Sequence, residues 1–122
     1  MTRRFIEAWL LLLYFDWLMR FRSFEVLHST VRNYRVNGVK WDEVDQLCRA
    51  VDYCCVFYFK RVLCLQRSAA TALLLRRHGW EAELVIGVQL LPFHSHAWVE
   101  VDGRVANDKP YVVDKFEVLE RC

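Results

Sequence analysis

The stretch from Phe93 to Asp108 constrains the fold of this chain most strongly, because its pattern predicts a β-hairpin. From His94 to Val101 the side chains alternate between two faces with the period of a β-strand, and Asp102-Gly103 then forms the turn. One face of this strand holds His94, His96, Trp98 and Glu100. The predicted hairpin therefore carries a histidine on one arm and an acid or an amide on the other.

The length of the turn decides which side chain of the second arm lies opposite His96. A two-residue type I′ loop at Asp102-Gly103 places Asn107 on the face of His96. A three-residue loop over 101–103, which ends in a bulge, pairs His96 directly with Asp108. Spacing alone leaves both registers open. An asparagine would hold the imidazole by a neutral hydrogen bond, whereas an aspartate would also stabilise the imidazolium.

A helix that begins near Cys64 precedes the hairpin. Apolar residues follow Cys64 at helical spacing, and Gly79 suits the position just after the helix end. Small residues would let this helix approach a sheet closely: Ser68, Ala69, Ala70 and Ala72. The amide dipoles at a helix start favour a thiolate. A thiol in that place, facing an imidazole and a carboxylate on a sheet, is typical of cysteine hydrolases and acyl transferases.

Three further helices are predicted before Cys64. The first, from Phe5 to about Arg20, is apolar on nearly every face, so part of its cover can come from another chain. The second begins at the N-cap Ser23 and ends at Asn37-Gly38. The third runs from about Trp41 to Cys54.

The remaining pattern predicts two more strands and an α+β fold. One strand runs from Glu81 to Leu91, and Val112-Val113 with 116–119 forms the last. We expect N-terminal helices packed on a small antiparallel sheet, in one domain that comprises a helical part and a part with the nucleophile helix and sheet: 1–122, divided into 1–61 and 62–122.

Composition narrows the classes of function. A hydrophobic fraction of 55% argues against disorder, and a net charge of +2 without a basic tract argues against nucleic-acid binding. Five cysteines, two of them adjacent and none in a CxxC pair, argue against a disulfide framework and favour the cytoplasm. The apolar run from Phe5 to Met19 contains Glu7 and Asp16 and is too short and charged to cross a bilayer. Peripheral membrane contact is the weaker alternative to a core helix.

The order Cys64, His96, Asp108 resembles that of the transglutaminase-like, papain-related fold. Between Cys64 and Asp108 a set of short motifs resembles, more narrowly, the B2 proteins of lasso-peptide biosynthesis. These motifs are Cys64-Leu-Gln-Arg-Ser-Ala-Ala, Arg77-His-Gly, Leu84-Val-Ile-Gly-Val, Pro92-Phe, His96-Ala-Trp-Val-Glu, Asp102-Gly-Arg-Val and Asn107-Asp. The segment 1–61 shares only helices that lead into the nucleophile.

The resemblance implies a cysteine peptidase that removes the leader from a ribosomally made lasso-peptide precursor through an acyl-enzyme, without cofactor or metal. It assigns Cys64 as nucleophile, His96 as general base and Asp108 as the residue that orients the imidazole, and so favours the three-residue loop. The implied partners are the precursor with its leader and an ATP-dependent macrolactam synthetase. A separate B1-type leader-recognition protein is also implied, because 1–61 lacks a winged-helix pattern.

Other interpretations stay open at this stage. The chain can be a non-catalytic binding module of a peptide-modifying complex, or an acyl transferase in which an amine replaces water. His94 can replace His96 as the base, or the two histidines can bind zinc with Cys64, although no fourth ligand is evident. Glu100 is expected at a solvated rim, and Arg76-Arg77-His78 as a charged set at a helix C-terminus.

Overall fold

The computed structural model describes residues 2–36, 43–90 and 92–122. Within them the elements are α1 (Thr2–Phe21), α2 (Phe24–Asn33), α3 (Val44–Phe57), α4 (Cys64–Arg77), β1 (Ala82–Leu90), β2 (Phe93–Val101), β3 (Arg104–Val105), α5 (Val112–Lys115) and β4 (Glu117–Arg121). The strands form one antiparallel sheet in the order β3-β2-β1-β4. The predicted α+β organisation, with N-terminal helices on a small antiparallel sheet, is therefore confirmed.

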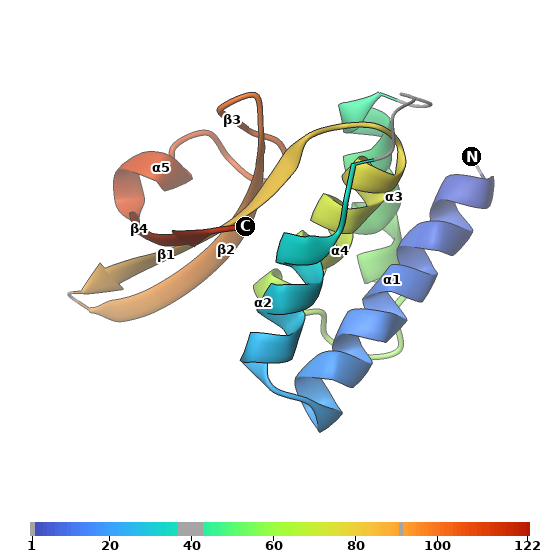
Figure 1. Ribbon diagram of the computed structural model, residues 1–122, viewed down its shortest axis with the longest axis horizontal. Coiled ribbons are helices and arrows are strands. Elements are labelled where there is room, and N and C mark those ends of the chain that lie inside the picture. The colour runs from blue at the N-terminus through green and yellow to red at the C-terminus, as the bar shows by residue number, and fades with distance from the viewer. Residues whose placement is uncertain (1, 37–42, 91) are drawn as a thin grey trace.

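The central element is α4. It contacts α1, α2 and α3 as well as β1 and β2, and Figure 1 shows α1 to α4 lying together on one side of the sheet. The small residues that were expected to allow a close approach are fully buried: Ser68, Ala69, Ala70 and Ala72. Because these side chains have few atoms, the helix backbone can lie near the sheet without leaving voids.

The first helix is covered on one side only. Its buried row consists of Ala8, Leu12, Phe15 and Leu18, whereas its exposed row consists of Ile6, Leu10, Tyr14, Trp17 and Phe21. The described part of the chain thus leaves an apolar row of this helix uncovered, and its cover by another chain stays a prediction. Of the helices in the described residues, none combines the length and apolar character that crossing a membrane requires.

Two of the predicted helix ends follow the capping rules. Ser23 accepts a hydrogen bond from the backbone N–H of Val26 at 3.4 Å, as predicted for an N-cap. Gly79, after α4, has a φ of 92°, which glycine adopts without strain. The helix α3 continues to Phe57, beyond its predicted end. The predicted stop at Asn37-Gly38 and the predicted helix start at Trp41, like the strand end at Leu91, lie outside the described residues.

The sheet separates two apolar clusters. Ala97 and Val99 of β2 face the helices in the main core. Trp98, on the opposite face, belongs to a second core whose buried members are Val85, Trp98, Val112 and Phe116. The alternation predicted for this strand therefore describes a strand buried on both faces over its C-terminal half.

The hairpin turn differs from the one that the family resemblance favoured. Val101 pairs with Arg104, so the loop contains only Asp102 and Gly103. Their φ values are 53° and 76°, the positive values that a two-residue type I′ turn requires. The three-residue loop was wrong because Asp and Gly tolerate this conformation, whose twist matches that of the strands.

The segment before the last strand was also predicted incorrectly. Val112 and Val113 lie in the helical turn α5 rather than in a strand, and β4 begins at Glu117. The backbone N–H of Phe116 donates to the carbonyl of Val112. A helical turn brings these residues, four apart, to one face so that both join the second core, whereas an extended strand would separate them by about 13 Å.

Gly87 should not tolerate a side chain. It lies opposite His96, and a Cβ built there would meet Trp98 Cη2 at 2.8 Å and Phe116 Cβ at 2.9 Å. We expect Gly87→Ala to lower the free energy of unfolding by about 1–3 kcal/mol through overpacking, measured by urea denaturation. Gly103→Ala, where nothing lies within 4 Å, is the control for backbone strain alone. Wild-type stability of Gly87→Ala would contradict this account of the second core.

Candidate active site

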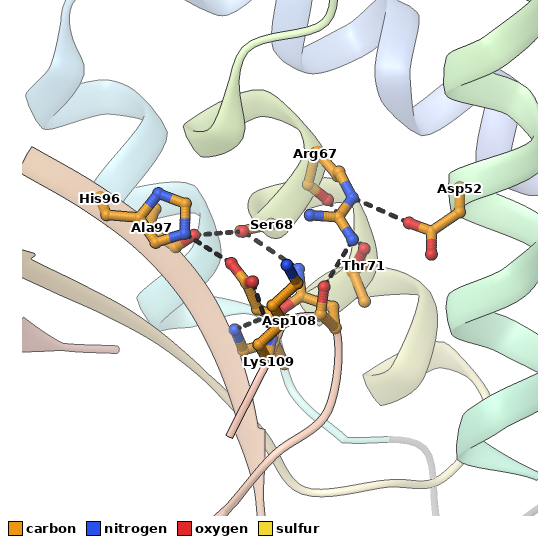
Figure 2. Close-up of polar contacts among 10 residues, drawn as sticks. Asp52, Arg67, Ser68, Thr71, His96, Ala97, Asp108 and Lys109 are labelled. Atoms are coloured by element: carbon orange, nitrogen blue, oxygen red, sulfur yellow. Dashed lines mark hydrogen bonds and ion pairs between the residues drawn. The ribbon is translucent and has the colours of Figure 1, made fainter. Parts of the chain in front are cut away.

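His96 and Asp108 form a direct pair. The imidazole Nε2 lies 2.5 Å from Asp108 Oδ2, and the other carboxylate oxygen accepts the backbone N–H of Lys109 at 2.7 Å. Figure 2 shows the His96 ring directed at this carboxylate. A carboxylate on Nε2 holds the ring proton there, which leaves Nδ1 as the nitrogen able to accept a proton from another group.

Two aromatic rings, which also pack against each other, lie against the imidazole. The centroid of the His96 ring lies 5.3 Å from that of Phe116 and 6.2 Å from that of Trp98, with interplanar angles of 26° and 30°. His94 lies against Phe116 at 5.7 Å and, among the described residues, makes no hydrogen bond to Asp108. The geometry therefore favours His96 over His94 as the oriented imidazole.

The Asp108 carboxyl is held in its charged form. Burial raises its pKa, but the hydrogen bonds from His96 and Lys109 and the positive charges of His96 and Arg67 together outweigh burial. The pKa of Asp108 is consequently below the ordinary value of 3.8. A carboxylate that stays ionised near neutral pH can stabilise an imidazolium beside it.

Asp108 reaches His96 because the chain leaves the regular ladder after β3. Ala106 still donates its backbone N–H to the Val99 carbonyl at 2.8 Å. The Val99 N–H then donates to a side chain, Asn107 Oδ1 at 2.8 Å, and not to the next backbone carbonyl of the ladder. The Asn107 amide thus turns toward α4, and the following residue approaches His96. Regular pairing with this turn would have placed Asn107 on that face instead.

Cys64 is the first residue of α4, and the N-terminus of that helix has no side-chain cap. Leu63 occupies the N-cap position, and the first turn contains no acidic residue. The first backbone bond runs from Arg67 N–H to the Leu63 carbonyl at 2.9 Å, so the N–H groups of residues 64–66 have no acceptor within the helix. These groups and the helix dipole favour a negative charge at Cys64.

Two buried hydrogen bonds show that α4 runs in the same direction as β2. Ser68 Oγ donates to the Ala97 carbonyl at 3.0 Å, and Arg76 Nε donates to the Ala82 carbonyl at 2.8 Å. Ala82 pairs with Val101, further along β2. The steps from Ser68 to Arg76 along the helix and from Ala97 to Val101 along the strand both measure about 12–13 Å. The helix α4 and the strand β2 therefore run parallel over this distance.

Cys64 lies one helical turn before Ser68, about 6 Å along the axis, which is about two strand residues before Ala97 and close to the level of Ser95 and His96. Arg67, in the same first turn, donates Nη2 to the backbone carbonyl that precedes Asp108, at 2.5 Å. The structure thus brings His96 and Asp108 together beside the first turn of α4. The imidazole extends from the face of β2 opposite α4, and no hydrogen bond among the described residues links Cys64 Sγ to either partner.

Comparison with known proteins assigns the family. A family model for the transglutaminase-like superfamily matches residues 9–121. The chain belongs to the transglutaminase-like superfamily. Microcin J25-processing protein McjB of Escherichia coli is 48% identical over 56 residues, which are 46% of this chain and 27% of that protein. The aligned part is therefore a minor share of the relative's length. No solved structure matches the chain.

The other thiols of this transglutaminase-like chain are held in the neutral form. Burial raises the pKa of Cys48 to about 12 and that of Cys54 to about 11. Burial also raises the pKa of Cys55 and Cys122. All five cysteines are free. Among the described residues, Cys64, His94 and His96 form no cluster able to hold a metal ion.

The sequence pattern failed to identify several polar residues around the site. Glu100 was expected at a solvated rim but is buried, and its carboxylate accepts hydrogen bonds from Trp98 Nε1 and Arg121 Nη1, both at 2.9 Å. Trp98 and Glu100 share a strand face, and a buried indole N–H needs an acceptor, which is the signal that could have revealed this bond. At the far end of α4, Arg76 lies in the last turn, as expected of a charged set at a helix C-terminus, but it is buried there with its guanidinium on backbone carbonyls.

Alkylation should distinguish Cys64 from the other cysteines. Because burial raises the pKa of the remaining four thiols, we expect iodoacetamide to modify Cys64 first at mildly acidic to neutral pH. His96→Ala should slow this reaction by removing the proton acceptor. Peptide mass mapping after short exposures measures both effects. Equal labelling of Cys64 and Cys55 would contradict the assignment of a reactive thiol at the helix start.

The charge of Asp108 should stabilise the fold in a defined pH range. A carboxyl whose pKa is lowered in the folded state contributes stability above its unfolded pKa and loses it as pH falls through the folded value. We therefore expect Asp108→Asn to be less stable than wild type near neutral pH, with a difference that shrinks below pH 3.8. Urea denaturation across this range measures it. A difference independent of pH would contradict the lowered pKa.

Proposed function

We propose that this chain is a cysteine peptidase that cuts the leader from a ribosomally synthesised lasso-peptide precursor. The observation that carries the proposal is the His96–Asp108 pair beside the uncapped first turn of α4, which begins with Cys64. The likeness to a microcin J25-processing protein supports the substrate class. Both partners of the pair are partly exposed, with side-chain exposures of 22% and 19%, so a peptide can reach them.

In the proposed acylation step, His96 Nδ1 takes the proton of the Cys64 thiol, and the thiolate attacks the carbonyl carbon at the leader–core junction. The carbonyl oxygen becomes an oxyanion, which the free N–H groups at the start of α4 stabilise. The tetrahedral intermediate then collapses, and the C–N bond breaks. His96 gives its proton to the departing core amine. The leader remains bound to Cys64 as a thioester.

In the proposed deacylation step, His96 removes a proton from water, and the resulting hydroxide attacks the thioester. The C–S bond breaks, the sulfur of Cys64 recovers a proton from His96, and the leader leaves with a free carboxylate. Asp108 keeps the proton on Nε2 and stabilises the imidazolium in both steps. No cofactor or metal takes part in this scheme.

The proposed partners follow from this reaction. The substrate is the precursor peptide with its leader, and a separate B1-type protein recognises that leader. The amine released by the cut is then available to an ATP-dependent macrolactam synthetase, which joins it to an acidic side chain of the core.

A binding function is the second candidate. The exposed row of α1, defined above by Ile6, Leu10, Tyr14, Trp17 and Phe21, is an apolar surface of the kind that contacts partners. In that case the chain would act as a scaffold of a peptide-modifying complex. Transfer of the acyl group to an amine instead of water is a further alternative, which the mass of the product separates from hydrolysis.

Replacing the nucleophile tests the proposed reaction. We expect Cys64→Ala to reduce leader cleavage by about 10⁴-fold or more, since the thioester cannot form. Its melting temperature should stay near that of wild type. Mass spectrometry of the precursor, incubated with the chain and its recognition partner, measures the cut. Cys55→Ala, which removes another partly buried thiol, is the matched control and should cleave normally. Cleavage by Cys64→Ala at the wild-type rate would refute the proposal.

A further inference from the structure

A buried set of side-chain hydrogen bonds connects α4, β2 and the segment after β3. We call it the Ser68–Asn107 clamp, and it comprises the side chains of Ser68 and Asn107 with the backbones of Ala97 and Val99. Asn107 Nδ2 donates to Ser68 Oγ at 3.1 Å, Ser68 Oγ donates to the Ala97 carbonyl at 3.0 Å, and Asn107 Oδ1 accepts the Val99 N–H at 2.8 Å. Figure 2 shows the bond between Ser68 and Ala97, which joins the helix to the strand.

Each end of the clamp is next to a proposed catalytic residue. Asn107 directly precedes Asp108, and Ala97 directly follows His96. Ser68 lies one helical turn after Cys64, on the side of α4 that packs against β2. The clamp therefore joins the three segments that carry the proposed nucleophile, base and orienting acid, although none of its own polar atoms contacts the imidazole or the Asp108 carboxylate.

The chemistry of the clamp requires these residue types. Exposure of Ser68 is 0% and that of Asn107 is 5%, so unpaired polar atoms here would be costly. The hydroxyl of Ser68 donates one bond and accepts another, while the amide of Asn107 accepts through oxygen and donates through nitrogen. An aspartate at position 107 could keep the bond to Val99 but could not donate to Ser68.

A second anchor supports the same segment from outside the clamp. Arg67 Nη2 donates to the backbone carbonyl of Asn107 at 2.5 Å, and Arg67 Nε pairs with Asp52 of α3 at 2.8 Å. The segment before Asp108 is thus held by a main-chain contact and by its side-chain amide. The redundancy makes it feasible to weaken the clamp while the fold persists.

We propose that Asn107 and Ser68 are positioning residues, which hold the start of α4 at the distance and orientation from the His96–Asp108 pair that proton transfer from Cys64 needs. The proposal rests on the proposed function. A displacement of about 1 Å between reacting groups can reduce turnover about 100-fold. A clamp that sets this separation therefore affects the chemical step and leaves contacts with the distant parts of the peptide unchanged.

The test compares Asn107→Asp and Ser68→Ala with Thr71→Val. Thr71 lies on α4 close to Ser68 and is 1% exposed, and its hydroxyl donates to the Arg67 carbonyl, so Thr71→Val removes a buried hydroxyl that is not part of the clamp. We expect the clamp variants to lower kcat by about 10- to 100-fold with KM within about twofold of wild type. Thr71→Val should lower the melting temperature about as much as the clamp variants do, but its kcat should equal that of wild type.

The rate at which iodoacetamide alkylates Cys64, measured across pH on the folded variants, separates this proposal from the proposed function. The positioning proposal predicts that Asn107→Asp and Ser68→Ala slow the alkylation and shift its pH profile toward that of His96→Ala. The alkylation profile of Thr71→Val should equal that of wild type. Wild-type profiles in both clamp variants would overturn the positioning proposal even if cleavage is observed. If the wild type does not cleave the precursor but the clamp variants have altered alkylation profiles, the proposed peptidase function is overturned and the positioning proposal stands.

Discussion

The packing of α4 against β2 is the constraint on which the rest of the structure depends. It is close because small side chains line the helix, and it is aligned because Ser68 donates to the Ala97 carbonyl in a fully buried contact. Because Ser68 contacts Ala97 and the helix runs parallel to the strand, the positive end of α4 at Cys64 lies close to the level of His96. The outer helices and the second core then hold this arrangement from both sides of the sheet.

Much of the fold could be predicted because periodicity records burial. The helices α1, α2 and α4 and the hairpin β1–β2 were predicted within a few residues, since each has either an apolar stripe, a cap or a strict alternation. Two features of the fold could not be predicted from the sequence. Turn length depends on the conformation that Asp102 and Gly103 adopt together, and the helical turn at Val112 depends on contacts with Trp98 in the second core. The Asp-Gly pair is compatible with both loop lengths, and the helical turn leaves no local signal.

At the candidate site, the sequence indicated which residue types matter, and the structure shows how some of them meet. His96 and Asp108 were predicted as partners through a hairpin register that proved wrong, and they meet because Asn107 leaves the ladder to bond Ser68. Asn107 was considered only as a rival of Asp108. The role of Asn107 in the buried network, like the burial of Arg76, depends on which backbone groups tertiary packing leaves to be satisfied, and a single sequence does not encode this as a pattern.

The central claim is that Cys64 and His96 belong to one site, although the imidazole projects from the face of β2 opposite α4. A bifunctional three-carbon reagent, 1,3-dibromoacetone, tests this most directly, because it alkylates a reactive thiol first and then bridges only to a nucleophile within its short reach. Intact mass and peptide mapping identify the product, with Cys64→Ala as the control. The account predicts a covalent bridge between Cys64 and His96. A single attachment at Cys64, or a bridge to a residue other than His96, would contradict it.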